Sequence, residues 1–165
     1  MLTYILALLC SAVIIAADQF TKYYILANFS MYDAKPFIKG IINITYVENN
    51  GGAWGVLGGY TWILLAVTAV IMIICITLLV KKGSKNPYFF WTVCIILAGG
   101  LGNMIDRIFR GGNVVDFLQF DFWRTFPVFN IADCAIVVGC VMLILYFAFD
   151  SLSTGEKTKA AKDEK

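Results

Sequence analysis

Residues 60–80 read YTWILLAVTAVIMIICITLLV, an apolar run that contains no charged side chain. A run of roughly twenty such residues is long enough to cross a hydrocarbon core of about 30 Å as a helix. The turn that follows, residues 81–86, reads KKGSKN, and a second apolar run begins immediately after it. Two long apolar runs joined by a short basic turn predict a pair of membrane-spanning helices.

Similar segments lie on both sides of this pair. The chain has apolar runs at about residues 4–27, 87–106 and 128–149, and none of them is interrupted by a proline-rich or repetitive segment. With 60% hydrophobic and 15% charged residues, the 165-residue chain is far more apolar than a soluble domain of its length. The first run lacks the basic start and the small-residue cleavage pattern of a leader, so we expect it to be a span. We predict an all-α polytopic membrane protein with four transmembrane helices in a single domain, residues 1–150.

Two longer connections join the spans at the end away from the basic turn. The first, about residues 30–59, contains the β-branched stretch 41–47, then the turn signal NNGG at residues 49–52 and a further apolar stretch at 53–57. This order predicts a small β-hairpin. The second, about residues 108–126, is rich in aromatic residues and is predicted to be an interfacial loop. Together they are expected to form an extracytoplasmic cradle.

Four spans place both chain ends on the same side of the membrane. The charged tail, residues 151–165, and the turn at residues 81–86 both carry lysines, and the turn carries no acid. The positive-inside rule therefore places both termini in the cytoplasm, although the basic residues divide seven to six between the two sides. We expect the tail to lack fixed structure and the two long connections to lie outside.

Acidic residues are concentrated at the end of the spans that holds the long connections. Seven of the eleven acidic residues lie there, and an unpartnered ionisable group at membrane depth costs several kcal/mol. Several polar residues are spaced three or four apart and so share a helix face. Small residues at positions 98–102 would let helices approach closely beside them. The residues that share faces are Asn103, Asp106 and Arg107; Asn130 and Asp133; and Asp18 and Lys22.

Two interpretations of these groups remain open from spacing alone. They can simply hold helices together, which we favour for Asp18 with Lys22 because an acid and a base four residues apart can satisfy each other. Asp133 fits this interpretation less well, since no basic residue follows it before the tail. A second carboxylate nearby would share a proton with it, and Asp116 is the natural candidate. Asp106 is less suitable because it ends a helix, where an anion needs a partner.

The composition excludes several kinds of chemistry. The chain has no histidine, which excludes the usual zinc sites and a Ser-His or Cys-His nucleophile, and it has no phosphate-binding glycine loop. The five cysteines are dispersed in apolar segments, and a net charge of +2 argues against nucleic acid as a partner. No metal or other cofactor is expected. What remains is a pair of aspartates, one to activate water and one to protonate the scissile group.

At this point the sequence resembles a known family, the bacterial lipoprotein signal peptidases, also called signal peptidase II. Tryptophan stands at position 54 where phenylalanine is frequent, and glycine and alanine are interchanged in the third motif, but neither departure touches a reactive group. The resemblance covers the chain from the first span to the fourth. The five motifs, in the family's order, are Asp18–Lys22, Asn49–Trp54, Gly99–Arg107, Val114–Phe117 and Phe129–Asp133.

The resemblance implies a multi-pass aspartyl endopeptidase of the bacterial cytoplasmic (inner) membrane, with its active site near the outer face. It implies that the substrates are prolipoproteins, cut on the N-terminal side of a diacylglyceryl-modified cysteine within membrane lipid, and that globomycin-type cyclic peptides inhibit the enzyme. It further implies that Asp116 and Asp133 are the catalytic dyad. The other implied roles are substrate binding by Asn49, Asn103, Arg107 and Asn130, and structural support by Asp18, Lys22 and Asp106.

Two other functions are compatible with the residues alone. A proton-coupled membrane carrier would use the aspartates as a relay, but it should show inverted repeats or helices broken at the midplane. Here the polar groups gather at one end of the spans instead. A noncatalytic scaffold would tolerate Asp→Asn substitutions, whereas a catalytic dyad would not.

Overall fold

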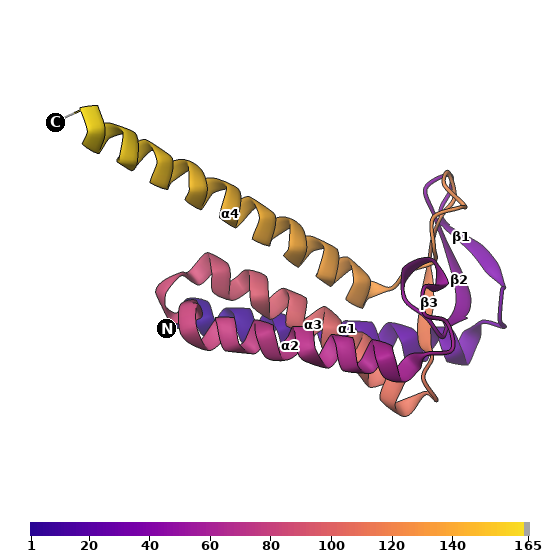
Figure 1. The fold of residues 1–165 in the computed structure, drawn as a ribbon. Helices are drawn as coiled ribbons and strands as arrows, with labels where there is room; N and C mark the ends of the chain where they lie inside the picture. The colour runs from indigo at the N-terminus through magenta and orange to yellow at the C-terminus, as the bar shows by residue number, and fades with distance from the viewer. Residues whose placement is uncertain (164–165) are drawn as a thin grey trace.

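The computed structural model describes the backbone of residues 1–163 and the side chains of residues 1–83 and 85–149. Four long helices extend from a small sheet at one end, and the fourth diverges from the others toward its C-terminus (Figure 1). Each is long and apolar enough to cross a membrane, the fourth over the segment Ile131–Phe149. The predicted membrane protein with four spanning helices is confirmed within the described residues. The helices are α1 (Leu2–Asn28), α2 (Thr61–Lys82), α3 (Pro87–Phe109) and α4 (Ile131–Asp163).

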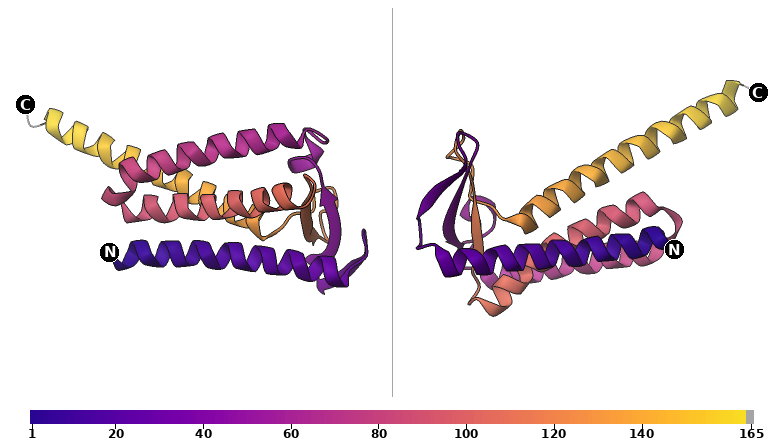
Figure 2. Two further views of the ribbon diagram at one scale, coloured as in Figure 1. Left: turned by 90° about the horizontal axis from the view of Figure 1, so that it is seen from below. Right: turned by 180° about the vertical axis from the view of Figure 1, so that it is seen from behind.

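The N-terminus, the turn between α2 and α3, and the far end of α4 all lie away from the sheet (Figure 2). The turn contains the short 3-10 helix η2 (Gly83–Lys85). Asn86 then caps α3 by accepting a hydrogen bond from the backbone N–H of Phe89, with Pro87 at the first helical position. The N-terminus, the end of α4 and the basic turn are therefore at the same end of the bundle.

α2 shows why these segments need a membrane. None of its side chains is buried within the protein, and apolar residues such as Ile63, Val70 and Ile73 are exposed. Apolar surface facing water costs roughly 25 cal/mol per Å². Lipid removes that cost, and a helix satisfies its own backbone groups there. α3 lies between the other helices and contacts all three, so the other helices pack mainly against α3.

Small residues on α3 let α1 and α4 approach it closely, as predicted for residues 98–102. A Cβ atom on Gly99 would meet the backbone carbonyl oxygen of Ala132 in α4. A Cβ atom on Gly102 would lie 2.7 Å from a carboxylate oxygen of Asp18 in α1 and 3.0 Å from the Cβ atom of Ala132. These two glycines therefore allow polar side chains from three helices to share one space.

The two long connections form one three-stranded antiparallel sheet in the order β1-β2-β3. β1 (Ala34–Ile38) and β2 (Ile42–Asn49) make a hairpin. β3 (Val114–Phe120), from the second connection, pairs with the other edge of β2. The second connection, predicted as an interfacial loop, therefore contains a strand of the sheet. The β-branched stretch is a strand as predicted, but it is the central strand of a sheet.

The predicted hairpin partner at residues 53–57 is wrong. This segment contains the short 3-10 helix η1 (Ala53–Gly55), and both Trp54 and Leu57 have positive φ angles, 55° and 61°. Residues other than glycine rarely adopt a positive φ angle, and a positive φ lies outside the range of a regular strand. β2 pairs with β1 along one edge and with β3 along the other, so neither edge is free to pair with residues 53–57.

The fourth helix differs from the prediction at both ends. It begins at Ile131, not near residue 128, because Phe129 is hydrogen-bonded to Leu118 of β3 in an isolated bridge. It continues to Asp163 through the tail for which we expected no fixed structure. Alanine, lysine and glutamate favour helix, and extending an existing helix needs no new nucleus.

An apolar core joins the sheet to the helices. Tyr46 of β2 and Val115 and Phe117 of β3 pack against Ile25 near the end of α1. All four are buried, so β3 is held firmly over the helix ends. Asp116 lies between the two buried residues of β3, and this fixes its position.

Candidate active site

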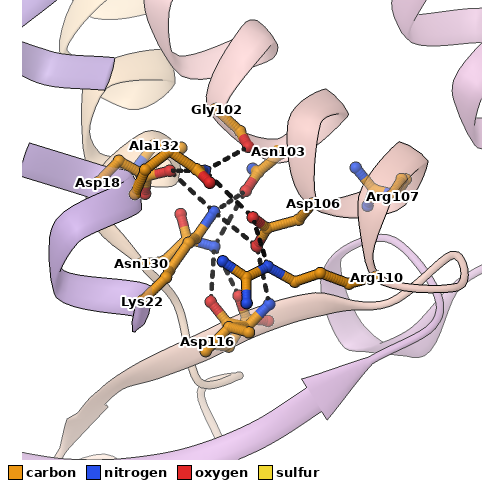
Figure 3. A network of polar contacts seen from close by, with 12 residues as sticks. Asp18, Lys22, Gly102, Asn103, Asp106, Arg107, Arg110, Asp116, Asn130 and Ala132 are labelled. Atoms are coloured by element: carbon orange, nitrogen blue, oxygen red, sulfur yellow. Dashed lines mark hydrogen bonds and ion pairs between the residues drawn. The ribbon is translucent and has the colours of Figure 1, made fainter. Parts of the chain in front are cut away.

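A buried lysine forms the centre of the polar cluster (Figure 3). Lys22 of α1 is fully buried, and its Nζ lies 2.9 Å from Asp18 Oδ2 and 3.0 Å from Asp106 Oδ2. Nζ also donates to Asn103 Oδ1 at 3.0 Å, so each of its three N–H groups has an acceptor. Buried charges are tolerated when they are paired in this way. The predicted contact between Asp18 and Lys22 is present, and Asp106 joins it.

Asp106 connects α3 to the sheet. Its Oδ2 accepts a hydrogen bond from the backbone N–H of Val115 in β3 at 3.1 Å. Its Oδ1 pairs with Arg110 Nε at 3.2 Å and accepts from Gln19 Nε2 at 3.1 Å. Asp18 accepts a hydrogen bond from a backbone N–H of α4 at 3.0 Å. Asp106, in the last turn of α3, therefore has the partners that an anion in that position needs.

Asp116 and Asp133 lie beside this network and are linked through two asparagines. Asn130 Nδ2 donates to Asp116 Oδ1 at 2.6 Å and to Asn103 Oδ1 at 3.1 Å. Asn103 Nδ2 in turn donates to Asp133 Oδ1 at 2.8 Å. Asn49, at the end of β2, donates to Asp116 Oδ2 at 2.9 Å. Amide donors from α3, the start of α4 and the sheet thus hold the two carboxyl groups.

Asn130 and Asp133 cap the start of α4 reciprocally. Asp133 Oδ2 accepts from the backbone N–H of Asn130 at 3.0 Å, and Asn130 Oδ1 accepts from the backbone N–H of Asp133 at 2.9 Å. This is a capping-box arrangement. Asp133 therefore lies in the first turn of α4, and the positive end of the helix dipole is beside it.

The environment of Asp116 favours its protonated form. Burial, and after it the negative charge of Asp133, raise the pKa of Asp116 from its usual range to about 7. The hydrogen bonds from Asn49 and Asn130 and the charge of Lys22 act in the opposite direction. A carboxyl group that titrates near neutral pH beside a second carboxyl group is suited to proton transfer.

Arg107 extends from α3 to the turn after β2. Its Nη2 donates to the carbonyl oxygen of Gly51 at 3.0 Å, while its Nε is buried and has no hydrogen-bond partner. Asn49 orders the same turn, because its Oδ1 accepts from the backbone N–H of Gly51 at 2.9 Å. The guanidinium charge acts on both Asp133 and Asp116. This turn and the arginine therefore border the two carboxyl groups.

All the residues singled out from the sequence lie in or beside this one cluster, but two participants were missed. Gln19 Nε2 lies 3.1 Å from oxygens of Asp18, Gly102 and Asp106. Its position next to Asp18 was a usable signal. Arg110 lies four residues after Asp106, a spacing that predicts an ion pair on a helix.

Comparisons of the sequence find one family. Residues 10–149 match the family model described as signal peptidase (SPase) II. The chain is 38% identical over 157 residues to the lipoprotein signal peptidase of Enterococcus faecalis, covering 95% of this chain and 92% of that protein. It is 41% identical over 137 residues to the lipoprotein signal peptidase of Brevibacillus brevis, covering 83% and 91%.

Comparisons of the fold agree with those of the sequence. Two solved structures of a bacterial membrane enzyme are each 33% identical to this chain. One superposes with a TM-score of 0.83 over 88% of each chain, and the other with a TM-score of 0.79 over 86% of this chain and 91% of that one. The four-helix arrangement and the sheet therefore recur in known membrane enzymes.

Proposed function

The chain belongs to the signal peptidase II family, and on that premise we propose that it is an aspartyl endopeptidase that cuts prolipoproteins on the N-terminal side of a diacylglyceryl-modified cysteine. Membership of the family makes it a membrane peptidase that removes signal peptides from lipoprotein precursors. The observation that carries the finer proposal is the pair Asp116 and Asp133. Both are held by amide donors beside a buried ion network, and Asp116 titrates near neutral pH.

In the proposed reaction Asp116 begins protonated and Asp133 begins as a carboxylate. Asp133 takes a proton from a water whose oxygen attacks the scissile carbonyl carbon, while Asp116 gives its proton to the carbonyl oxygen. The tetrahedral diol then breaks at its C–N bond. The leaving nitrogen takes the proton from Asp133, and a diol hydroxyl returns one to Asp116. The products are a carboxylic acid and an amine, and the pair is restored.

The substrate-binding roles are assigned to Asn49, Asn103, Asn130 and Arg107. Arg107 offers the clearest support, because its buried Nε donor has no partner. An unsatisfied buried donor costs about 1–3 kcal/mol, and a carbonyl oxygen of a bound precursor would remove that cost. The guanidinium presents several donors in a fixed fork, which lysine would not reproduce.

We further propose that both termini are cytoplasmic and that the site lies near the outer face. In a cysteine-free background, a cysteine replacing Lys35 in β1 is expected to react with a membrane-impermeant reagent added outside intact cells. A cysteine replacing Lys85 in the α2–α3 turn should react only after the membrane is opened, since the positive-inside rule keeps this basic turn in the cytoplasm. The reverse labelling pattern would invert the orientation.

The substrate assignment is tested with one precursor prepared with and without the diacylglyceryl group. Acyl chains and a signal helix are expected to hold the scissile bond at headgroup level, which is the depth proposed for Asp116 in β3 and Asp133 at the start of α4. Purified protein is therefore expected to cut the lipidated precursor and to cut the unlipidated one very poorly. Equal rates for both, measured side by side in the same micelles, would show that lipid recognition plays no part.

Activity is expected to fall as the pH rises above about 7. The reactive form needs the proton on Asp116, and its pKa of about 7 means that this form decreases about tenfold for each further pH unit. Initial cleavage rates should therefore be roughly a hundredfold lower two units above that pKa. The thermal unfolding midpoint, measured at the same pH values, separates this titration from unfolding. A rate that stays constant or rises through that range contradicts the assignment of the proton.

A further inference from the structure

The tip of the sheet projects sideways past the helix bundle. The strands run across the ends of the helices, and the β1–β2 turn and the end of β3 extend beyond the start of α4 (Figures 1 and 2). We call this region, residues 35–42 and 120–124, the sheet tip. Its two halves are joined by a hydrogen bond of 2.9 Å from the backbone N–H of Asp121 to the carbonyl oxygen of Ile41. In a membrane the sheet tip would lie over the lipid beside the bundle.

The face of the sheet that carries Asp116 and Leu118 continues onto the sheet tip. Ile44 and Leu118 are paired across β2 and β3, and both pack against the apolar core at the end of α1. Residues opposite each other in antiparallel strands point to the same face, and so do residues two apart along a strand. Ile42 and Phe120 are the next such pair, and Ile38 of β1 is paired with Ile42. An apolar face therefore passes from the protein interior out beyond the helices.

Further apolar side chains on the sheet tip are exposed. Phe37 and Phe122 are 69% and 67% exposed, and Ile41 and Trp123 are about half exposed. Trp123 also packs against Phe126, with ring centroids 5.0 Å apart, in the loop that leads to α4. Adjacent exposed apolar side chains mark a binding surface. Aromatic rings next to a membrane-spanning bundle are typical of the headgroup level.

Three basic side chains border these apolar residues. Lys35 lies in β1 and Lys39 in the turn that follows it, and both are exposed. Arg124 is 73% exposed and pairs with Asp121 at 2.8 Å. Asp33, just before the sheet tip, accepts a hydrogen bond from a local backbone N–H. One acid within the sheet tip leaves an excess of positive charge at its edge.

We propose that the sheet tip is a lipid-binding surface that rests in the headgroup layer and selects anionic phospholipid. Its apolar face, which carries Ile38, Ile42 and Phe120, meets the upper part of the acyl chains. Lys35, Lys39 and Arg124 contact the phosphate and the negatively charged headgroup. Continuity with the lipid-exposed bundle and the charge at the edge both favour lipid over a protein partner. The inference rests on the membrane fold and is independent of the peptidase activity.

The test measures the contact of Trp123 with lipids in proteoliposomes that contain the full chain. Brominated phosphatidylglycerol or brominated phosphatidylcholine is included at equal mole fraction, and quenching of the fluorescence is compared. Basic side chains at a membrane surface each favour anionic lipid by about fivefold at most, so we expect several-fold stronger quenching by the anionic lipid. The single-tryptophan protein carries Trp54→Phe, Trp62→Phe and Trp91→Phe.

A triple variant separates charge from depth. Removing the three positive charges of the sheet tip should abolish the preference for the anionic lipid while leaving quenching by the zwitterionic lipid in place. A control with the same loss of charge at the opposite end of the bundle should keep the preference. The sheet-tip variant carries Lys35→Gln, Lys39→Gln and Arg124→Gln, and the control carries Lys81→Gln, Lys82→Gln and Lys85→Gln.

Three outcomes would overturn the proposal. Equal quenching by both lipids in the unaltered sheet tip would show that headgroup charge is not recognised. Quenching by neither lipid, together with strong quenching by iodide in the water, would show that the sheet tip points away from the membrane. Protection of Trp123 only when precursor is added would identify a protein-binding surface instead. Each variant is first checked for an unfolding midpoint close to that of the single-tryptophan protein. A further variant, Phe37→Ser, changes an exposed apolar residue of the sheet tip. It should weaken quenching by both lipids without lowering that midpoint.

Discussion

Replacing either Asp116 or Asp133 by asparagine is expected to lower the rate of precursor cleavage by about 10²–10⁴-fold, the range that a positioned proton-transfer group contributes. Asparagine keeps the shape of the side chain but neither binds nor releases a proton near neutral pH. Both oxygens of each carboxyl group accept a hydrogen bond from an N–H donor. An amide would place one N–H donor opposite another, which leaves a donor unsatisfied at a cost of about 1–3 kcal/mol. The protein should therefore remain folded.

Asp121→Asn is the matched control for these two variants. Asp121 lies in the same connection as Asp116 and accepts hydrogen bonds from Asn43 and Arg124, but it is outside the polar cluster. Its substitution removes one carboxylate and should leave the cleavage rate within about twofold of the original, as is usual for surface groups. If either Asp116→Asn or Asp133→Asn kept more than a few per cent of the original rate, the assignment of these two residues as the catalytic dyad would fail.

The parts of the fold that follow from local pattern were predictable. Four apolar runs gave the four spans, and the spacing of Asn103 and Asp106 predicted that they face a common space. The contact between Asp18 and Lys22 follows from the same helical period. The choice of Asp116 as partner for Asp133 began from the observation that no basic residue follows Asp133 before the tail, and their role as a catalytic pair stays a prediction.

The parts that depend on distant pairing were not predictable. β3 joins β2 across a long separation in sequence, and nothing within residues 53–57 revealed that both edges of β2 were occupied. The bond from the backbone N–H of Val115 to Asp106 exists only because that pairing brings the strand over α3. The start of α4 was misplaced because Phe129 pairs with β3 and Asn130 serves as a cap, and both effects require knowledge of the sheet.

Replacing Lys22 by methionine is expected to destabilise the protein more than any other substitution in the cluster. Methionine has a similar length and no charge, so it leaves Asp18 and Asp106 fully buried without their shared cation. Removing one member of a buried ion network typically costs about 3–5 kcal/mol. For a chain of this size that corresponds to a fall on the order of 10 °C in the thermal unfolding midpoint, measured in detergent. Lys35→Met, at an exposed position in β1, should change the midpoint by no more than a degree or two.

Asp106→Asn should be less damaging than Lys22→Met, because Lys22 keeps Asp18 as its partner. It still removes the ion pairs of Asp106 with Lys22 and Arg110, so we expect the midpoint to fall. An unchanged midpoint with loss of cleavage would show that Asp106 acts in the reaction and not in the architecture.

Neutralising the whole network distinguishes loss of pairing from loss of shape. Buried ion networks replaced as a unit by neutral residues often lose little stability, because no charge remains without a partner. The triple variant Lys22→Met, Asp18→Asn, Asp106→Asn should therefore recover part of the midpoint lost in Lys22→Met. Lys22 also donates to Asn103, which holds Asp133, so the triple variant should regain stability without regaining full cleavage. A triple variant that is less stable than Lys22→Met would mean that the lysine acts through packing, and that the two carboxylates do not depend on its charge.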